Sequence, residues 1–135
     1  MRAVVDTNVI AYHLLGTPKF ASEAGDFLAR AQDLVAPSLW QAEIANVIWM
    51  AVRSRVLAPD HALAKLTLAM RLGVEAIPIR TLWHAALIRS LDSDVAVYDT
   101  LFIELAERES LPLVTFDQRL LAAFPKVAKR PRACP

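Results

Sequence analysis

The stretch that decides the fold is residues 1–16, MRAVVDTNVIAYHLLG. The apolar residues up to Val5 are typical of a buried strand, and those after Asp6 are typical of an apolar helix. A strand that leads directly into a helix favours a parallel sheet covered by helices. Asp6 stands at the junction of the two elements, where it is either a helix N-cap or part of a functional site.

Short strand-like runs alternate with longer helical runs along the rest of the chain. We expect strands over residues 3–6, 33–37, 74–79 and 111–116, and helices over 7–15, 18–32, 38–55, 59–73, 80–92, 97–110 and a short stretch from Asp117. This alternation predicts a three-layer α/β/α domain with a central parallel sheet. We assign residues 1–125 to that domain and residues 126–135 to a basic C-terminal tail, which is either solvated or attracted to an RNA backbone.

The bulk composition narrows the classes of protein. A chain of 135 residues with a formal net charge of +1 is one domain and does not resemble a strongly basic nucleic-acid-binding protein. No apolar run reaches the roughly 18 residues that a membrane span needs. The start of the chain lacks the layout of a signal peptide, and Cys134 is the only cysteine. We therefore expect a cytoplasmic protein that does not enter membranes.

The apolar content indicates self-association. The hydrophobic fraction of 56% exceeds the usual content of about 45–50%. Trp40 and Trp49 lie nine residues apart, on opposite faces of the helix expected over 38–55, and both faces cannot easily pack on one sheet. We therefore expect a homodimer, because a two-fold interface is the commonest way to cover such surface.

Three aspartates stand at or near strand-to-helix junctions. Asp6 and Asp117 each follow a strand directly, and Asp99 lies near the start of the helix expected over 97–110. Each alone could be an N-cap, but ligands of parallel sheets bind at the carboxyl ends of the strands, where all three would meet. Glu43 lies inside an apolar helix, where an unpaired carboxylate is costly, unless it is half exposed near the helix N-terminus.

A cluster of Asp6, Glu43, Asp99 and Asp117 would need a cation, because neighbouring carboxylates raise one another's pKa. All of these donors are hard oxygens, which favours Mg²⁺ or Mn²⁺ over Zn²⁺. A Mg²⁺ ion held by carboxylates suits the chemistry of phosphate esters.

Four segments together resemble the PIN-domain ribonucleases, in particular the VapC-like toxins of type II toxin–antitoxin systems. They are VVDTNVI, APSLWQAEIANVIW, VYDTLFIELAE and LPLVTFDQRL, and they span roughly residues 2–121. The resemblance implies a Mg²⁺-dependent endoribonuclease with metal-binding and catalytic carboxylates at Asp6, Glu43, Asp99 and Asp117. It also implies supporting roles for Asn8 and Thr115, an RNA substrate and a cognate antitoxin.

Two other functions remain open from the sequence. A haloacid-dehalogenase-like phosphatase shares the strand followed by D-x-D, but Asn8 replaces the second acid that this family uses. A PIN fold that only binds, without catalysis, is the other alternative, although all four acids are present. The sequence leaves the RNA target and the number of metal ions undetermined.

Overall fold

The computed structural model describes residues 1–135, and its centre is the strand β1 (Arg2–Val5). β1 lies in the middle of a five-stranded sheet in the order β3-β2-β1-β4-β5, and every neighbouring pair is parallel. The other strands are β2 (Asp33–Pro37), β3 (Glu75–Ile77), β4 (Leu113–Val114) and β5 (Ala128–Lys129). The parallel sheet is what the sequence predicted.

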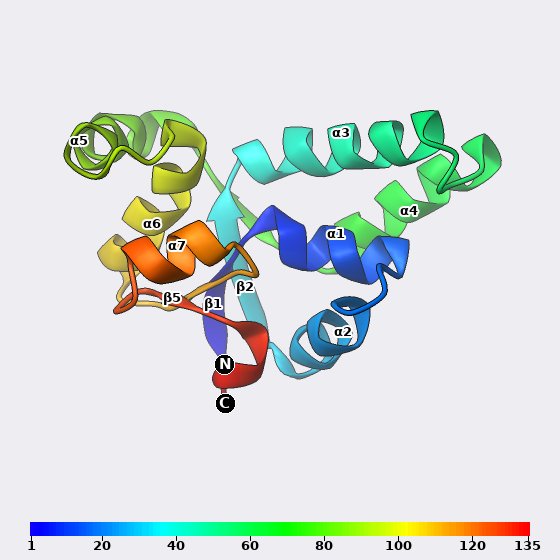
Figure 1. The fold of residues 1–135 in the computed structure, drawn as a ribbon, viewed down its shortest axis with the longest axis horizontal. Coiled ribbons are helices and arrows are strands. Elements are labelled where there is room, and N and C mark those ends of the chain that lie inside the picture. Colours follow the sequence, from blue (N-terminus) through cyan, green and yellow to red (C-terminus); the bar gives the residue numbers. More distant parts are fainter.

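Helices cover both faces of this sheet. Figure 1 shows α1 (Thr7–Leu15), α2 (Ala21–Arg30), α3 (Leu39–Arg53) and α4 (Pro59–Arg71) on one side of the strands. On the other side lie α5 (Trp83–Ser93), α6 (Val97–Glu109) and α7 (Gln118–Ala123). The predicted three-layer α/β/α arrangement is therefore confirmed. None of these helices combines the length and the apolar character needed to cross a membrane.

The hydrophobic core explains why β1 carries no polar residue after Arg2. Ala3, Val4 and Val5 are completely buried, because helices cover the strand on both faces. The helix α1 adds Val9 and Ile10 to the same core, where both are completely buried. The continuous apolar run that ends before Asp6 thus forms the central strand, and Asp6 lies at the edge of the core.

The order of the strands creates a crevice next to β1. The chain moves from β1 to β2 and β3 in one direction, and then returns to add β4 and β5 on the opposite side. β1 and β4 are held in register, with Val5 opposite Val114, and the Asp6 N–H donates to the Val114 carbonyl at 2.9 Å. The elements that leave these two strands diverge, so ligands of such sheets bind at this point.

Several elements are shorter than the sequence predicted. The strand expected over 74–79 ends at Ile77, because Pro78 has no N–H to donate, and a 3-10 turn follows over Ile79–Thr81. The strand expected over 111–116 pairs only at Leu113–Val114. α2 begins at Ala21 rather than 18, because Lys19 adopts a positive φ of 83° that breaks the helical path.

The last ten residues, which the sequence assigns to a basic tail, contain a short strand and a turn. β5 extends the sheet beside β4, and a second 3-10 turn follows over Pro131–Ala133. Pro131 and Cys134 are buried. The two-residue strand carries too little pattern to be predicted from the sequence, and the residues around it are basic.

Candidate active site

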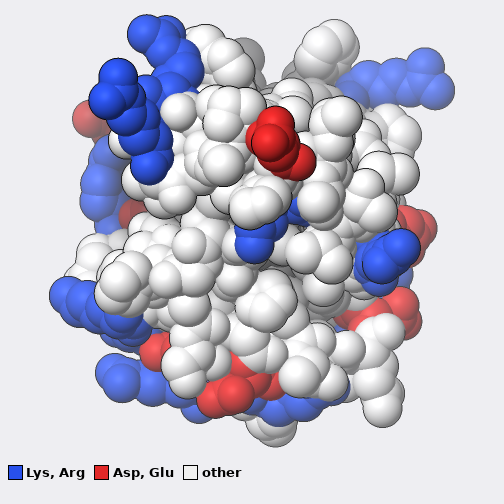
Figure 2. Space-filling model, turned by 90° about the vertical axis from the view of Figure 1, so that its right-hand side faces the viewer, with Lys and Arg blue, Asp and Glu red and all other residues white.

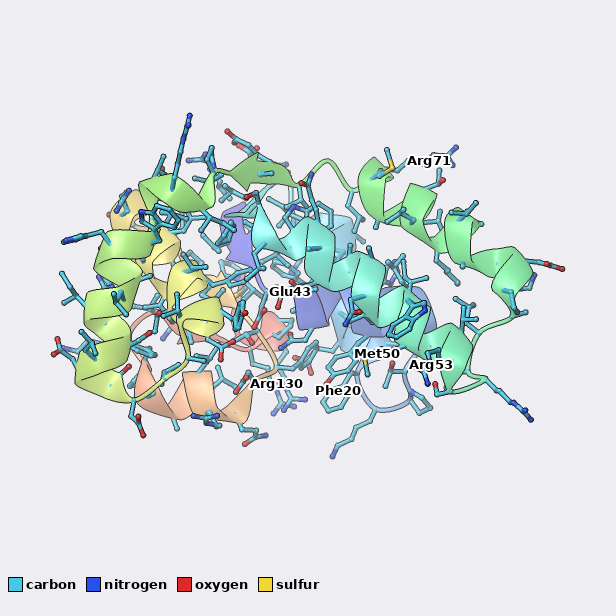
Figure 3. All side chains as sticks on the ribbon, turned by 90° about the horizontal axis from the view of Figure 1, so that it is seen from above. Phe20, Glu43, Met50, Arg53, Arg71 and Arg130 are labelled. Carbon is cyan, nitrogen blue, oxygen red and sulfur yellow. The ribbon has the colours of Figure 1, made fainter.

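The four carboxylates singled out in the sequence line a single cavity at the carboxyl edge of the sheet. Asp6, Glu43, Asp99 and Asp117 are joined there by residues of α1 and by Thr17, and the cavity measures about 370 Å³. They come from the end of β1, from α3, from the first turn of α6 and from the segment after β4. Figure 3 shows Glu43 at the centre of the molecule when it is viewed from above.

Asp6 occupies the N-cap position of α1, but its side chain makes no capping hydrogen bond. One carboxylate oxygen, Oδ2, instead accepts from the Thr115 hydroxyl at 2.8 Å and from the Asn8 amide at 3.3 Å. Burial, followed by the nearby carboxylates Glu43 and Asp99, raises the pKa of Asp6 to about 7, although the Thr115 bond opposes this shift. The side chain therefore points into the cavity rather than stabilising its own helix.

Asn8 and Thr115 tie the two strand ends together. The Thr115 hydroxyl donates to Asp6 and accepts both the Asp117 N–H at 2.9 Å and the Asn8 amide at 3.2 Å. Asn8 Oδ1 also accepts the Phe116 N–H at 3.2 Å. The buried Thr115 hydroxyl thus uses its one donor and both acceptor positions within the network. Asn8 and Thr115, for which the family resemblance implies supporting roles, lie beside the carboxylates.

Asp117 occupies the N-cap position of α7, and its side chain forms capping hydrogen bonds. Its Oδ1 accepts from the backbone N–H groups of Arg119 at 2.8 Å and Leu120 at 3.2 Å, which stabilises the start of α7. These bonds engage only one carboxylate oxygen. Asp6 and Asp117 share the same local sequence pattern, yet one side chain caps a helix and the other does not.

Glu43 is held by a residue that the sequence analysis did not single out. The Thr7 hydroxyl donates to Glu43 Oε1 at 2.8 Å, from the first residue of α1. Burial raises the pKa of Glu43, the Thr7 bond opposes that shift, and the Asp99 charge adds to it. The only sequence signal for Thr7 is a hydroxyl beside Asp6, which is also ordinary at a helix start.

Asp99 lies within the first turn of α6, whose N-cap is Ala96, so it does not cap that helix. Burial and the neighbouring Asp117 charge raise the pKa of Asp99, while Arg119 lowers it. Three carboxyl groups in one cavity therefore resist ionisation. This is the electrostatic state that a bound cation would relieve.

The chemistry of the donor set fits a hard divalent cation. The acidic groups that line the cavity offer only oxygen ligands, and no His or Cys lines it. This donor set suits Mg²⁺ or Mn²⁺ better than Zn²⁺. In this arrangement no three of the acidic side chains are close enough together to contact one ion, so binding an ion would require them to move closer to one another.

Comparison with known proteins agrees with the fold. Residues 3–129 match the PIN domain family. The chain is 30% identical to "Ribonuclease VapC3" of Pyrobaculum aerophilum over 132 residues, which are 93% of this chain and 96% of that protein.

Solved structures with the same fold come from three bacteria. A toxin–antitoxin complex from Klebsiella pneumoniae is similar with a TM-score of 0.67 and 18% identity, over 96% of this chain and 97% of that one. VapBC2 from Rickettsia felis, bound to a DNA fragment from its promoter, gives 0.66 and 14%, over 96% and 98% of the two chains. FitAcB from Neisseria gonorrhoeae gives 0.65 and 18%, over 99% and 100%. Together with the match over nearly the whole domain, the sheet order and the acidic cavity, this establishes that the chain belongs to the PIN domain family.

Proposed function

We propose that this chain is a divalent-metal-dependent endoribonuclease and the toxin of a toxin–antitoxin pair. The observation that carries the proposal is the cavity where Asp6, Glu43, Asp99 and Asp117 converge from four separate elements. Concentrating carboxylates whose pKa values rise is unfavourable for folding, so the arrangement is best explained by a cation-dependent function. The relative called a ribonuclease supports RNA as the substrate.

Each side chain has a role in this proposal. Asp6, Asp99 and Asp117 would hold a Mg²⁺ or Mn²⁺ ion once drawn together, and Glu43 would orient water or help to bind a second ion. Thr115 and Asn8 fix the Asp6 carboxylate, while Thr7 fixes Glu43. A bound divalent cation would lower the pKa of water and stabilise the charge that develops on the phosphate. This chemistry has no need of the ribose 2′-hydroxyl as the nucleophile.

The proposed partner is a small antitoxin that covers apolar surface next to the acidic cavity. A second cavity of about 390 Å³ adjoins the first one and shares Leu15, Thr17 and Val47 with it. Figure 2 shows that the face at this end of the molecule is largely uncharged, with Lys and Arg mainly at its edges. An amphipathic helix could cover such a surface and extend a basic side chain to the carboxylates. The similar structures that contain toxin–antitoxin complexes support this partner, and we place both proteins in the cytoplasm.

Neither alternative is favoured by a specific observation. A haloacid-dehalogenase-like phosphatase would need an acid at Asn8, whose amide instead donates to Asp6 and Thr115 and accepts from Phe116. A module that only binds would have no use for four carboxylates around one cavity.

The test is cleavage of a structured RNA pool by the purified chain, with Mg²⁺ or Mn²⁺ and with excess EDTA. We expect cleavage only with the metal, and products with 5′-phosphate and 3′-hydroxyl ends. D6N and D99N should abolish cleavage, while D92N, which removes an exposed acid of α5, should cut like the wild type. Cyclic 2′,3′-phosphate ends, or full activity in EDTA, would contradict the mechanism.

A further inference from the structure

Hydrogen bonds of Arg30 and Glu23 in α2 join this helix to the C-terminal segment. Arg30 donates to the Pro131 carbonyl at 2.8 Å and to the Cys134 carbonyl at 3.1 Å. Glu23 accepts from Arg130 Nε at 3.1 and 3.2 Å and from the Arg132 backbone N–H at 3.1 Å. Both residues of the Glu23–Arg130 pair are partly buried, so solvent screens the pair less than an exposed one. We call these contacts the C-terminal clasp.

The clasp places Arg130 on an aromatic cluster. The Arg130 guanidinium lies 5.4 Å from the centre of the Phe116 ring, within the range of a cation–π interaction. The same ring lies 5.0 Å from Phe20 and 5.5 Å from Tyr12, which itself lines the acidic cavity. In Figure 3, Arg130 and Phe20 lie on the same side of Glu43. Phe116 therefore contacts two aromatic rings and a cation.

Phe116 is part of the backbone that presents the site. It stands between Thr115 and Asp117, and its N–H donates to Asn8 Oδ1 at 3.2 Å. The strand that leads into it is fixed by the clasp segment as well, because the Thr115 N–H donates to the Lys129 carbonyl at 3.0 Å. A displacement of the Phe116 ring would therefore move the Asn8, Thr115 and Asp117 groups together.

We propose that Arg130 is a positioning residue for the acidic site. Held by Glu23, it fixes the Phe116 ring, and the ring fixes the backbone that carries Thr115 and Asp117. The part that concerns metal binding rests on the function proposed above. Removing a direct hydrogen-bond partner of a metal ligand weakens metal binding by at least about tenfold, so loss of Arg130, which acts through Phe116, should weaken Mn²⁺ binding by roughly two- to tenfold.

The experiment compares R130A with K126A, which removes a cation from the same segment but has no contact with Phe116. Mn²⁺ affinity is measured by calorimetry, and exchange of the Phe116 and Asp117 amide protons by NMR without metal. In R130A we expect weaker Mn²⁺ binding and about tenfold faster exchange of both amides, with the Asp6 amide in the sheet unchanged. K126A should match the wild type in both measurements.

A second pair of variants tests the route through the ring. E23Q keeps Arg130 but weakens its anchor, and it should show a smaller change in the same direction. In a F116L background, which removes the π face, R130A should have no further effect on Mn²⁺ affinity. E23Q also provides the measurement if R130A does not fold.

The outcomes separate this proposal from the proposed function. Unchanged amide exchange in R130A would overturn the positioning role, as would a lower melting temperature with unaltered Mn²⁺ affinity. A higher KM for RNA with kcat and Mn²⁺ affinity intact would also overturn it, since Arg130 would then be a contact for RNA phosphates. Wild-type protein that binds no Mn²⁺ while R130A still speeds amide exchange would count against the metal site, not against the Arg130–Phe116 contact.

Discussion

At the scale of single residues, Asp6 brings a charge into the core that the metal-free protein tolerates poorly. Its pKa rises from 3.8 to about 7, mainly because of burial. Below pH 3.8 the carboxyl group is protonated in both the folded and the unfolded chain. Between that pH and about 7 only the folded chain keeps the proton, so the free energy of unfolding falls as the pH rises.

The first prediction follows from this loss of stability at rising pH. D6N should raise the stability of the metal-free protein at pH 8 by about 2 kcal/mol, which is less than the full pKa shift implies because the other carboxylates remain. The gain should shrink towards pH 4, where the wild-type carboxyl group is protonated. Urea unfolding in EDTA at several pH values measures it. A D6N protein that is less stable at pH 8 would indicate that the Asp6 charge supports the fold.

The second prediction concerns the Thr115 hydroxyl. T115V keeps the shape of the buried side chain but leaves the Asp117 N–H without its acceptor, removes one of the two acceptors of the Asn8 amide and takes the hydroxyl donor from Asp6. We expect a loss of about 1–3 kcal/mol in unfolding free energy, since unsatisfied buried donors are costly. T115S retains the hydroxyl and is the matched control. Equal stability of T115V and the wild type in urea unfolding would show that the network contributes little.

The sequence could predict which acids meet, but not how each is held. A parallel sheet collects groups at its carboxyl edge, so the convergence of Asp6 and Asp117 follows from the strand pattern. Asp99 does not follow from it, because α6 comes directly after α5 with no strand between them. The Asp6 carboxylate accepts from Thr115, which follows the neighbouring strand β4, whereas Asp117 accepts from N–H groups of its own helix. The bond from Thr7 to Glu43 joins residues 36 positions apart and leaves no local pattern.

At the scale of elements, the long, strongly patterned segments were predictable and the short ones were not. The helices α1 and α3 lie within one or two residues of expectation, because their apolar periodicity extends over several turns. β5 has two residues, and its place in the sheet depends on pairing with β4 and on the ion pair of Glu23. Such contacts are decided by tertiary structure and cannot be read from local pattern.

The third prediction tests the role of that edge element. Deletion of residues 126–135 removes the carbonyls that accept the N–H groups of Leu113 and Thr115, and it leaves β4 as an exposed edge. We expect the melting temperature to fall by more than about 10 °C and aggregation to increase, as measured by calorimetry and light scattering. Deletion of Pro135 alone is the control. An unchanged melting temperature of the longer deletion would mean that β5 adds no stability.

At the scale of the whole molecule, large apolar side chains remain exposed at two separate ends. Trp83, Leu87 and Leu91 lie on α5, and Leu91 is 76% exposed. Trp49 and Met50 lie on α3, and Trp49 is 54% exposed whereas Trp40 is buried. Figure 1 places α5 at the opposite end from the junction of α3 and α4. Two apolar surfaces at opposite ends allow two different partners to bind at once.

The fourth prediction assigns the α5 surface to a homodimer. We expect twice the chain mass of 14.9 kDa by light scattering at micromolar concentration. L91E should yield the monomer, because dimerisation would bury the new carboxylate without an opposite charge to pair with it. M50E changes the other surface and should leave the dimer intact. A monomeric wild type would refute the homodimer, and a dimer of L91E would refute its assignment to α5.

The last prediction assigns the α3 surface to the antitoxin and couples it to the metal. Met50 lines the cavity that adjoins the acidic one, and Figure 3 shows it on the same helix as Glu43.

If a basic side chain of the partner reaches the carboxylates, it competes with the cation for the same charges. Affinity for the partner should therefore fall as Mg²⁺ rises, and D99N should weaken the complex and reduce the effect of Mg²⁺. M50A should weaken the complex equally at all Mg²⁺ concentrations, because it removes an apolar contact and adds no charge. The chain is expressed with and without the product of its neighbouring gene, and the purified complex is titrated by calorimetry. Toxicity that co-expression relieves is the expected result, whereas an affinity that is independent of Mg²⁺ in the wild type would place the partner away from the acidic cavity.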